Sequence, residues 1–384
     1  MTFIKKEIKP KKIWVIDIWT YKIRVWICKI KNNNIELIWY WEKRQDPDYI
    51  LMQEFQNLEW VSQNIKEAIH KAEKDSNTKI DEIIINIPTG DIFFEFSKVN
   101  HIRKNEWELI KKELKDLLKS TKLKVEEKHY KNIFKNYWFK KSDVRLLISD
   151  ISHILLDNKS TTTIIWNSPK EVNISILNIF LSESKIETMK FIENYISKKI
   201  IQIIPSEYAV LQLFNHKKNI VIIDFWDSHL SIIVKKDDNI VWIKKLNFWI
   251  NDLIKKIRKN HNIPKNKIIQ DIDKNIFLPE KIDFLNILKD ILVITLEEIL
   301  KEEVCPNKFC IIWWGANNFL KDYLKNISLT DSNLKIVWKI VYTNPKVDFL
   351  DENTTKSPEW IDQARSNINI FSLIKSSLSF INKK

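Results

Sequence analysis

The sequence predicts an α/β fold built from two similar lobes, and two observations lead to this prediction. Apolar, strand-like runs alternate with segments of helical spacing along the 384 residues. One order of elements, three strands followed by a helix, also occurs twice, with little sequence identity between the copies. Because 44% of the residues are hydrophobic, the chain can bury a large core, which excludes a disordered or fibrous protein.

The first copy covers the N-terminal part of the chain. Residues 13–18 and 23–30 are expected to form two strands joined by a short turn, and residues 35–42 a third strand. Residues 61–74 have apolar or small side chains at Val61, Ile65, Ala68, Ile69 and Ala72, which is helical spacing. The apolar run 80–87 is then a buried strand that ends at Pro88, Thr89 and Gly90.

The second copy has expected strands at 219–225, 230–234 and 240–244 and a helix at 250–258. A long helix at 287–303 leads to a strand at 309–312, and a helix at 186–197 precedes a strand at 200–204. Between the copies lies a stretch of different character, with a helix at 106–119, a polar region, and strand-like runs at 144–156 and 161–165. This stretch is interpreted as an inserted subdomain.

The expected domains follow from this order. Residues 10–90 and 174–215 form the first lobe, and residues 91–173 form the inserted subdomain. Residues 216–250 and 303–384 form the second lobe, which carries a smaller subdomain at 251–302.

Charge and cysteine content limit the cellular setting. The net charge is +13, but acidic residues lie among the lysines along the whole chain, so we expect no nucleic-acid partner. The basic stretch 5–12 is not followed by an apolar segment, and no run of 18 apolar residues exists. The three cysteines indicate a reducing compartment, and Cys305 and Cys310 lack the histidine partner of a zinc site. We therefore expect a cytoplasmic protein, with a peripheral place at the inner face of the membrane left open.

The glycine and tryptophan counts do not fit an ordinary chain. There are 2 Gly and 16 Trp, where a typical content of about 7% would give roughly 27 Gly. An A+T-rich genome explains few glycines but not many tryptophans, whose codon is G-rich. Some bacterial lineages read the codon UGA as Gly, while a commonly used alternative table reads it as Trp. We hypothesise that most or all of the sixteen are glycines in the cell; the rival interpretation is that they are genuine aromatics on strands and in cores.

Three segments in which an apolar strand runs into a turn carry the chemistry. In the first, Asp17 stands two residues before Trp19, and in the second, Asp224 stands two residues before Trp226. The third runs from Cys310 through Trp313 and Trp314 to Gly315 and Ala316. With Gly in place of Trp, the three segments resemble the two phosphate hairpins and the adenosine loop of the superfamily of actin, sugar kinases and heat-shock chaperones. Such hairpins need Gly because their turns require φ > 0 and their N–H groups must approach phosphate oxygens closely.

Within that superfamily the sequence is most similar to FtsA, the actin-like protein of bacterial cell division, over nearly the whole chain. The similar stretches beyond the hairpins are residues 39–41, 148–158, 205–210, 246–252 and 357–359. The place of the insertion, after the first copy, is also where FtsA carries its own subdomain. The resemblance implies an actin-like, ribonuclease H-like fold of two lobes with ATP and Mg²⁺ between them.

The same resemblance assigns the site residues. Asp17 and Asp224 would be the catalytic residues and would hold Mg²⁺, directly or through water. The nucleotide would be held by two phosphate loops and an adenosine loop: Trp19, Thr20, Tyr21 and Lys22; Trp226, Asp227 and Ser228; and Trp313, Trp314, Gly315 and Ala316. The second loop departs from the family pattern, because Asp227 would repel a γ-phosphate, so at most slow ATP hydrolysis is expected.

The function implied is to polymerise, to bind the tubulin-like division protein FtsZ and to link it to the membrane. A C-terminal apolar stripe, at Ile370, Leu373, Ile374, Leu378 and Ile381, either lies on the membrane or faces the core. Two alternatives remain open: an actin-like protein of type IV pilus assembly, and a small-molecule kinase of the same superfamily.

Overall fold

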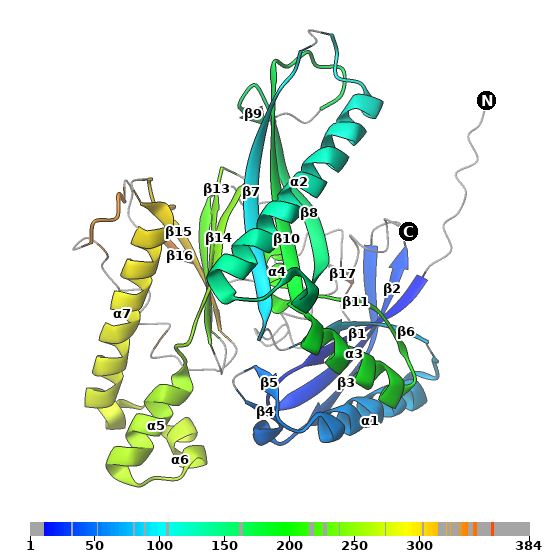
Figure 1. Ribbon diagram of the computed structural model, residues 1–384. Coiled ribbons are helices and arrows are strands. Elements are labelled where there is room, and N and C mark those ends of the chain that lie inside the picture. The colour runs from blue at the N-terminus through cyan, green and yellow to red at the C-terminus, as the bar shows by residue number, and fades with distance from the viewer. Residues whose placement is uncertain are drawn as a thin grey trace. The chain divides into compact units, whose positions relative to one another are not determined.

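A computed structural model shows two compact units (Figure 1). The structure describes residues 11–31, 34–51, 53–79, 81–87, 90–104, 107–160, 164–214, 219–225, 229–237, 239–272, 274–301, 303–313, 320, 323, 329, 332–336, 341–343 and 355–356. The first unit comprises Met1–Gly90, Ile192–Val234 and Ile243–Lys384. The second comprises Asp91–Phe191 and Lys235–Trp242.

The first sheet of the first unit has the strand order β11-β6-β1-β2-β3-β17. Its strands are β1 (Lys11–Ile18), β2 (Lys22–Lys31), β3 (Asn34–Arg44), β6 (Glu82–Asn86), β11 (Lys199–Ile203) and β17 (Thr355–Lys356). The first three strands pair antiparallel, whereas β6 runs parallel to β1 and to β11. The short strands β4 (Ile50–Leu51) and β5 (Glu54–Phe55) form a separate ribbon.

Helix α1 (Leu58–Ser76) packs on β2 and β3 of this sheet. Asn57 caps its first turn by accepting a hydrogen bond from the backbone N–H of Trp60. The helix buries Val61, Ile65, Ala68, Ile69 and Ala72, which confirms the face that the sequence predicted. Trp60 lies in the first turn of this helix.

The second sheet of the first unit has the order β14-β13-β12-β15-β16. Its strands are β12 (Ile220–Phe225), β13 (Leu230–Lys236), β14 (Asn239–Leu246), β15 (Lys308–Trp313) and β16 (Val341–Thr343). In each sheet the three strands of one copy lie side by side, in chain order. Next to the first strand of the copy lie two strands from later in the chain, β6 and β11 in the first sheet and β15 and β16 in the second. The structure therefore confirms the predicted repeat.

The remaining helices lie between these strands in the chain. They are α3 (Glu183–Ile196), α4 (Ser206–Leu213), α5 (Ile250–His261), α6 (Lys265–Asp271) and α7 (Leu278–Leu300). The 3-10 turns are η1 (Pro47–Tyr49), η2 (Lys141–Asp143) and η3 (Asn275–Phe277). Trp249 is the N-cap of α5. Within the described residues, no helix is long and apolar enough to cross a membrane.

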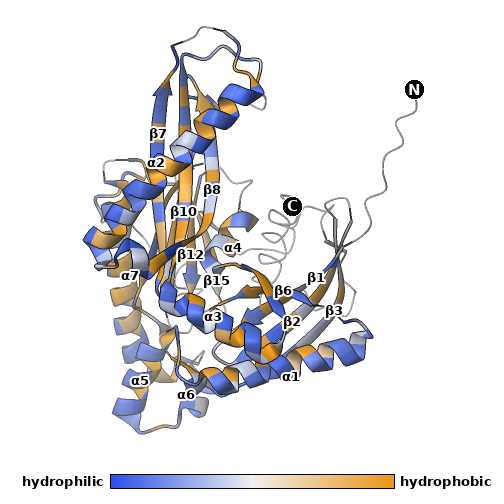
Figure 2. Ribbon diagram, turned by 45° about the vertical axis from the view of Figure 1, so that its right-hand side comes forward, coloured by the Kyte–Doolittle hydropathy of each residue, from blue (hydrophilic) through white to orange (hydrophobic). Residues whose placement is uncertain are grey.

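The second unit is an antiparallel sheet, β7-β10-β8-β9, covered by one long helix. The strands are β7 (Ile92–Ile102), β8 (Val144–Leu156), β9 (Lys159–Ser160) and β10 (Glu171–Ser182), and the helix is α2 (Lys111–Tyr137). Figure 2 shows β10, one of the two inner strands, as largely apolar. Helix α2 packs against β10 and β7 and shares a core with residues such as Val172, Ile174 and Ile176.

Several expectations for this unit were wrong. The helix was expected at 106–119, but it begins at Lys111 and continues to Tyr137, through the segment interpreted as a polar region. Its buried residues recur every four positions from Thr121 to Ile133, and the lysines between them hid this spacing from sequence reasoning. Residues 164–165 are not in a strand, and the expected subdomain boundary at residue 173 falls inside β10.

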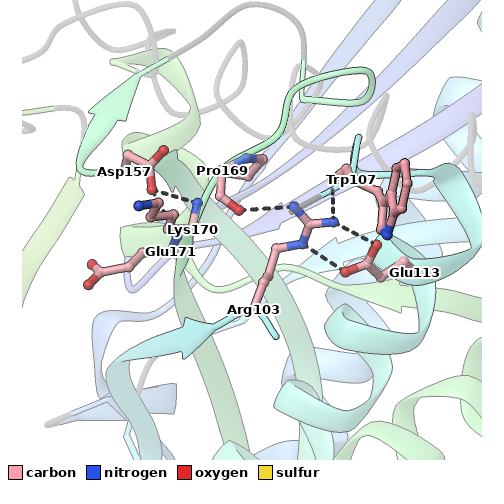
Figure 3. A network of polar contacts seen from close by, with 7 residues as sticks. All are labelled: Arg103, Trp107, Glu113, Asp157, Pro169, Lys170 and Glu171. Carbon is pink, nitrogen blue, oxygen red and sulfur yellow. Dashed lines mark hydrogen bonds and ion pairs between the residues drawn. The ribbon is translucent and has the colours of Figure 1, made fainter. Parts of the chain in front are cut away.

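A polar network joins the loops at one end of this sheet (Figure 3). The Arg103 guanidinium binds both carboxylate oxygens of Glu113, at 2.8 and 3.0 Å. It also donates to the backbone carbonyls of Trp107 and Pro169, each at 2.9 Å. The carboxylate of Asp157 accepts hydrogen bonds from the backbone N–H groups of Lys170 and Glu171. Arg103 therefore ties the end of β7 to the start of α2 and to the loop before β10.

Candidate nucleotide-binding site

Asp17 and Asp224 occupy the same place in the two sheets of the first unit. Each is the last residue but one of the first strand of its copy, β1 or β12, and each is fully buried. In each sheet that strand pairs in parallel with a strand from later in the chain, β6 or β15. The sequence predicted Asp17 and Asp224 near the ends of two strands, because each follows an apolar run.

The Asp17 carboxylate is held by the neighbouring strand. Asn86, at the end of β6, donates a hydrogen bond to Asp17 Oδ1 at 2.8 Å. Burial raises the pKa of Asp17 to about 6, although Arg24, Asn86 and Trp19 partly offset this effect. A buried carboxylate with incomplete charge compensation is suited to a cation, because a positive ion would supply the missing compensation.

A hydrogen-bonded chain continues from Asp17 to the start of α4. The Ser206 hydroxyl donates to Asn86 Oδ1 at 3.0 Å, so Asn86 bridges β1 and α4. Asn86 and Ser206 are both buried. Sequence reasoning did not single out either residue, although Asn86, like Asp17, is a polar residue that ends an apolar strand.

Glu207, the next residue of α4, is a fully buried carboxylate beside β13. Its Oε1 accepts a hydrogen bond from the Ser231 hydroxyl at 3.2 Å and lies 3.4 Å from Nε2 of His229. Burial alone would raise the pKa of Glu207, but the Lys245 ammonium and His229 lower it to about 2. Burial lowers the pKa of His229, although the Glu207 carboxylate beside it partly raises that pKa again. Lys245 and His229 therefore favour the ionised form of Glu207, whereas burial favours the neutral form of His229.

Neither residue of this pair is among the site residues that the sequence predicted. The full burial of Glu207 against β13 results from packing between segments far apart in the chain. The structure also buries the His229 ring against Glu207.

Trp19 occupies the space next to Asp17 in the first hairpin. Its indole N–H donates to Asp17 Oδ2, and the Arg24 guanidinium lies 4.2 Å from the centre of its ring. The turn itself is closed by the hydrogen bond from Trp19 N–H to the carbonyl of Lys22, at 2.9 Å. As the sequence is written, the indole stands where a phosphate or Mg²⁺ would approach the carboxylate. The residues present fit a nucleotide only if position 19 lacks this side chain.

The backbone of the first hairpin corrects one expectation. Trp19 is not among the described residues with positive φ, so the turn at this position does not itself require glycine. Thr20, Tyr21 and Lys22 follow in the turn and at the start of β2, and all are half-buried. Glycine is favoured at position 19 because the side chain there lies against the Asp17 carboxylate.

Two other tryptophans do have the backbone conformation that glycine favours. Trp138, which ends α2, has φ 64° and is 80% exposed, and Trp166 has φ 70° and is 67% exposed. A bulky residue rarely adopts this left-handed region, and glycine is the common residue at such a helix end. Trp14, by contrast, is fully buried in β1, and its indole N–H has no hydrogen-bond partner.

The other predicted loops lie outside the described residues. This holds for Trp226, Asp227 and Ser228 of the second phosphate loop, and for Trp314, Gly315 and Ala316 of the adenosine loop. Trp313 is the last residue of β15. The C-terminal apolar stripe, residues 357–359 and Trp360 are also outside them. Within the part of the chain that the structure describes, no group of three or more His, Cys, Asp or Glu side chains could hold a metal ion.

Comparison by sequence finds no relatives: no model of a protein family matches, and no curated protein matches either. Comparison by structure does find similar proteins. A PilM–PilN type IV pilus biogenesis complex matches with a TM-score of 0.64 and 10% identity, over 97% of this chain and 99% of that one. The ethanolamine utilization protein EutJ from Carboxydothermus hydrogenoformans matches with a TM-score of 0.46 and 8% identity, over 86% of each chain.

A third solved structure is a protein from Bacteroides thetaiotaomicron described as having an actin-like ATPase fold and unknown function. It matches with a TM-score of 0.38 and 12% identity, over 85% of this chain and 91% of that one. The chain has the actin-like ATPase fold, as predicted: two sheets of one strand order, with a buried Asp at the same strand end in each. At 10% identity the likeness to the PilM–PilN complex concerns the fold alone.

Proposed function

We propose that the native protein has glycine at the positions written Trp19, Trp226, Trp313 and Trp314 and is an ATP- and Mg²⁺-binding, actin-like scaffold. In this proposal it assembles into polymers and recruits a partner protein to the inner face of the cell membrane. The observation that carries the proposal is the equivalence of Asp17 and Asp224, two buried carboxylates at the same strand end of two like sheets. Carboxylate oxygens at such a place are suitable ligands for Mg²⁺.

The residues have distinct roles in this proposal. Asp17 and Asp224 hold Mg²⁺, and Asn86 orients the Asp17 carboxylate through its 2.8 Å hydrogen bond. The turn from position 19 to Lys22 and the loop from position 226 to Ser228 contact the phosphates. Positions 313 to 316 contact adenosine, at the end of β15.

In this proposal ATP is hydrolysed slowly at most, because Asp227 would repel a γ-phosphate. A nucleotide that is hydrolysed slowly acts mainly as a ligand that sets conformation and assembly.

The partner we propose is FtsZ, with the chain linking it to the membrane at the division site. A PilN-type protein is the second candidate partner. It is supported by the likeness to the PilM–PilN complex, which covers 97% of this chain, the inserted subdomain included, and 99% of that one. The place of the insertion therefore does not distinguish a division protein from a pilus-assembly protein.

The direct test of nucleotide binding uses a protein in which all sixteen Trp are changed to Gly. We expect it to bind a fluorescent ATP analogue in a Mg²⁺-dependent manner, and the Asp17→Asn variant of the same protein to lose that dependence. If the all-glycine protein is folded by circular dichroism and binds no nucleotide, the proposed function is wrong.

The choice of partner requires a second experiment. The all-glycine protein, with ATP, is mixed with purified FtsZ or with the cytoplasmic segment of a PilN-type protein, and each mixture is analysed by pull-down and by sedimentation. Binding of FtsZ supports the division role, and binding of the PilN segment alone supports the pilus role. Transfer of phosphate from ATP to an added sugar would instead identify a small-molecule kinase.

A further inference from the structure

Helix α2 of the second unit concentrates positive charge to a degree that the other long helices do not. Its 27 residues contain nine lysines and four acidic residues. Helix α7, with 23 residues, contains two lysines and five acidic residues, and α1 contains three lysines and four acidic residues. A lysine-rich codon usage acts on all three helices alike, so it does not explain the excess in α2.

Most of this charge lies on the surface. Eight of the nine lysines are exposed: Lys111, Lys112, Lys115, Lys119, Lys124, Lys128, Lys131 and Lys135. The ninth, Lys122, donates a hydrogen bond to the carbonyl of Ser149 at 3.1 Å. Among the described residues, none of the eight forms an ion pair. Two acidic residues of α2 are already paired elsewhere, Glu113 with Arg103 and Glu127 with Lys141.

Two apolar side chains lie between the lysines on the outward face. Leu123 is 58% exposed and Phe134 is 48% exposed. They are eleven residues apart, which is about three helical turns, so they lie on one line along the helix. At 100° per residue, Lys115 and Lys119 lie on one side of this line, and Lys124 and Lys131 lie on the other. The opposite side of α2 packs on the sheet through residues such as Thr121 and Val125.

We propose that this face of α2 binds an anionic lipid bilayer. The helix is about 40 Å long. Its lysines would contact the headgroups, while the Leu123 and Phe134 side chains would enter the boundary between headgroups and acyl chains. A nucleic-acid backbone would satisfy the lysines but offers no apolar surface to Leu123 and Phe134, so the bilayer is the better match. The contact does not involve the nucleotide site and holds whichever partner the protein recruits.

The test measures co-sedimentation of the full chain with vesicles. One set contains phosphatidylcholine only, and the other contains one part phosphatidylglycerol to two parts phosphatidylcholine. The test variant carries Lys115→Gln, Lys119→Gln, Lys124→Gln and Lys131→Gln, because Gln keeps helix propensity close to that of Lys. The control carries the same change at four exposed lysines outside α2, namely Lys74, Lys79, Lys190 and Lys259, so both proteins have the same net charge.

We expect the unmodified chain and the control to bind the anionic vesicles, and to bind less as salt is added. The α2 variant should bind at least about tenfold more weakly. Equal binding by the α2 variant and the control would overturn the proposal, because the contact would then lie elsewhere, for example in the C-terminal stripe. Absence of vesicle binding by the unmodified chain would overturn it as well.

A second variant separates a bilayer from nucleic acid. Leu123→Gln combined with Phe134→Gln removes the apolar line and leaves every lysine. We expect weaker binding to anionic vesicles and unchanged binding to heparin, used as a polyanion without an apolar phase. If the variant binds vesicles as well as the unmodified chain does, the apolar side chains do not enter the bilayer. If the chain binds duplex DNA through these lysines but no vesicle, the surface is a nucleic-acid site, and the proposal is wrong.

Discussion

Helices α1 and α2 end in the same backbone conformation but with very different residues. Asn77 at the end of α1 has φ 47°, and Trp138 at the end of α2 has φ 64°. Asn tolerates the left-handed region because its short side chain can hydrogen-bond locally, whereas Trp has no such compensation. The difference shows that the chain needs a glycine-like residue at a place where the sequence has Trp. The hypothesis that Trp stands for Gly thus gains support from a position with no part in nucleotide binding.

At position 19 the space beside the Asp17 carboxylate, and not the backbone conformation, favours glycine over tryptophan. The prediction concerns two proteins, one with all sixteen Trp changed to Gly and one that keeps only Trp19. Because the Trp19 indole contacts the Asp17 carboxylate, the second protein should bind ATP at least about one hundredfold more weakly, which corresponds to roughly 2.7 kcal/mol. Titration of both with a fluorescent ATP analogue measures the difference. Equal affinity would show that the indole moves aside and that position 19 does not control the site.

The histidines of the two helices differ in burial, and this predicts a pH effect confined to α2. Burial lowers the pKa of His129 to about 4, and its Nε2 lies 2.8 Å from the Ser97 hydroxyl, whereas His70 of α1 is exposed. A depressed histidine pKa stabilises the folded state above the unfolded pKa of about 6.5, and this contribution is lost as the pH falls towards 4. Hydrogen exchange of the α2 amides should therefore show a loss of about 2 kcal/mol over that range.

The matched variants for this prediction are His129→Gln and His70→Gln. The first should remove most of the pH dependence of exchange in α2, and the second should leave it unchanged. An unaltered pH dependence in His129→Gln would assign the effect to other groups.

The helix ends themselves give the next prediction. Trp138→Gly should stabilise the second unit by about 1 to 2 kcal/mol, because it removes the cost of holding a Cβ in the left-handed region. Trp138→Ala should give no such gain, since alanine keeps the Cβ. Urea unfolding followed by hydrogen exchange of α2 amides measures both. If alanine stabilises as much as glycine, the relief comes from losing the exposed ring and not from the backbone.

Trp166 tests the same argument in a loop. Its N–H donates to the Leu109 carbonyl at 3.1 Å, so this loop is tied to the start of α2. Trp166→Gly should stabilise the second unit by about 1 kcal/mol. Unfolding midpoints of the variant and the parent chain, measured side by side, check this value. A destabilised variant would mean that the Trp166 ring makes contacts worth more than the backbone cost.

The smallest effect is expected at the end of α1. Asn77→Gly should change stability by only a few tenths of a kcal/mol, because Asn already tolerates the left-handed region. It serves as the reference for Trp138→Gly in the same urea experiment. A gain as large as that at Trp138 would remove the difference on which the comparison rests.

Local patterns made much of the fold predictable. Apolar runs ending in Asp17 and Asp224 gave the strand ends of both sheets, and the spacing from Val61 to Ala72 gave α1. The course of α2 was predicted only in part, because its lysines obscured the buried positions. The partners in the site could not be predicted: Asn86, Ser206, Ser231 and Lys245 are brought to Asp17 and Glu207 by pairings between strands and helices far apart in the chain.

The central claim is that tryptophans at glycine-requiring positions are glycines in the cell. Peptide mass spectrometry of the protein purified from its own cells tests it directly, on peptides that cover positions 19, 138, 166, 226, 313 and 314. The account predicts Gly at all six. Trp at positions 19, 226, 313 and 314 would contradict it, because the nucleotide site would then be blocked and only an actin-like scaffold without nucleotide would remain.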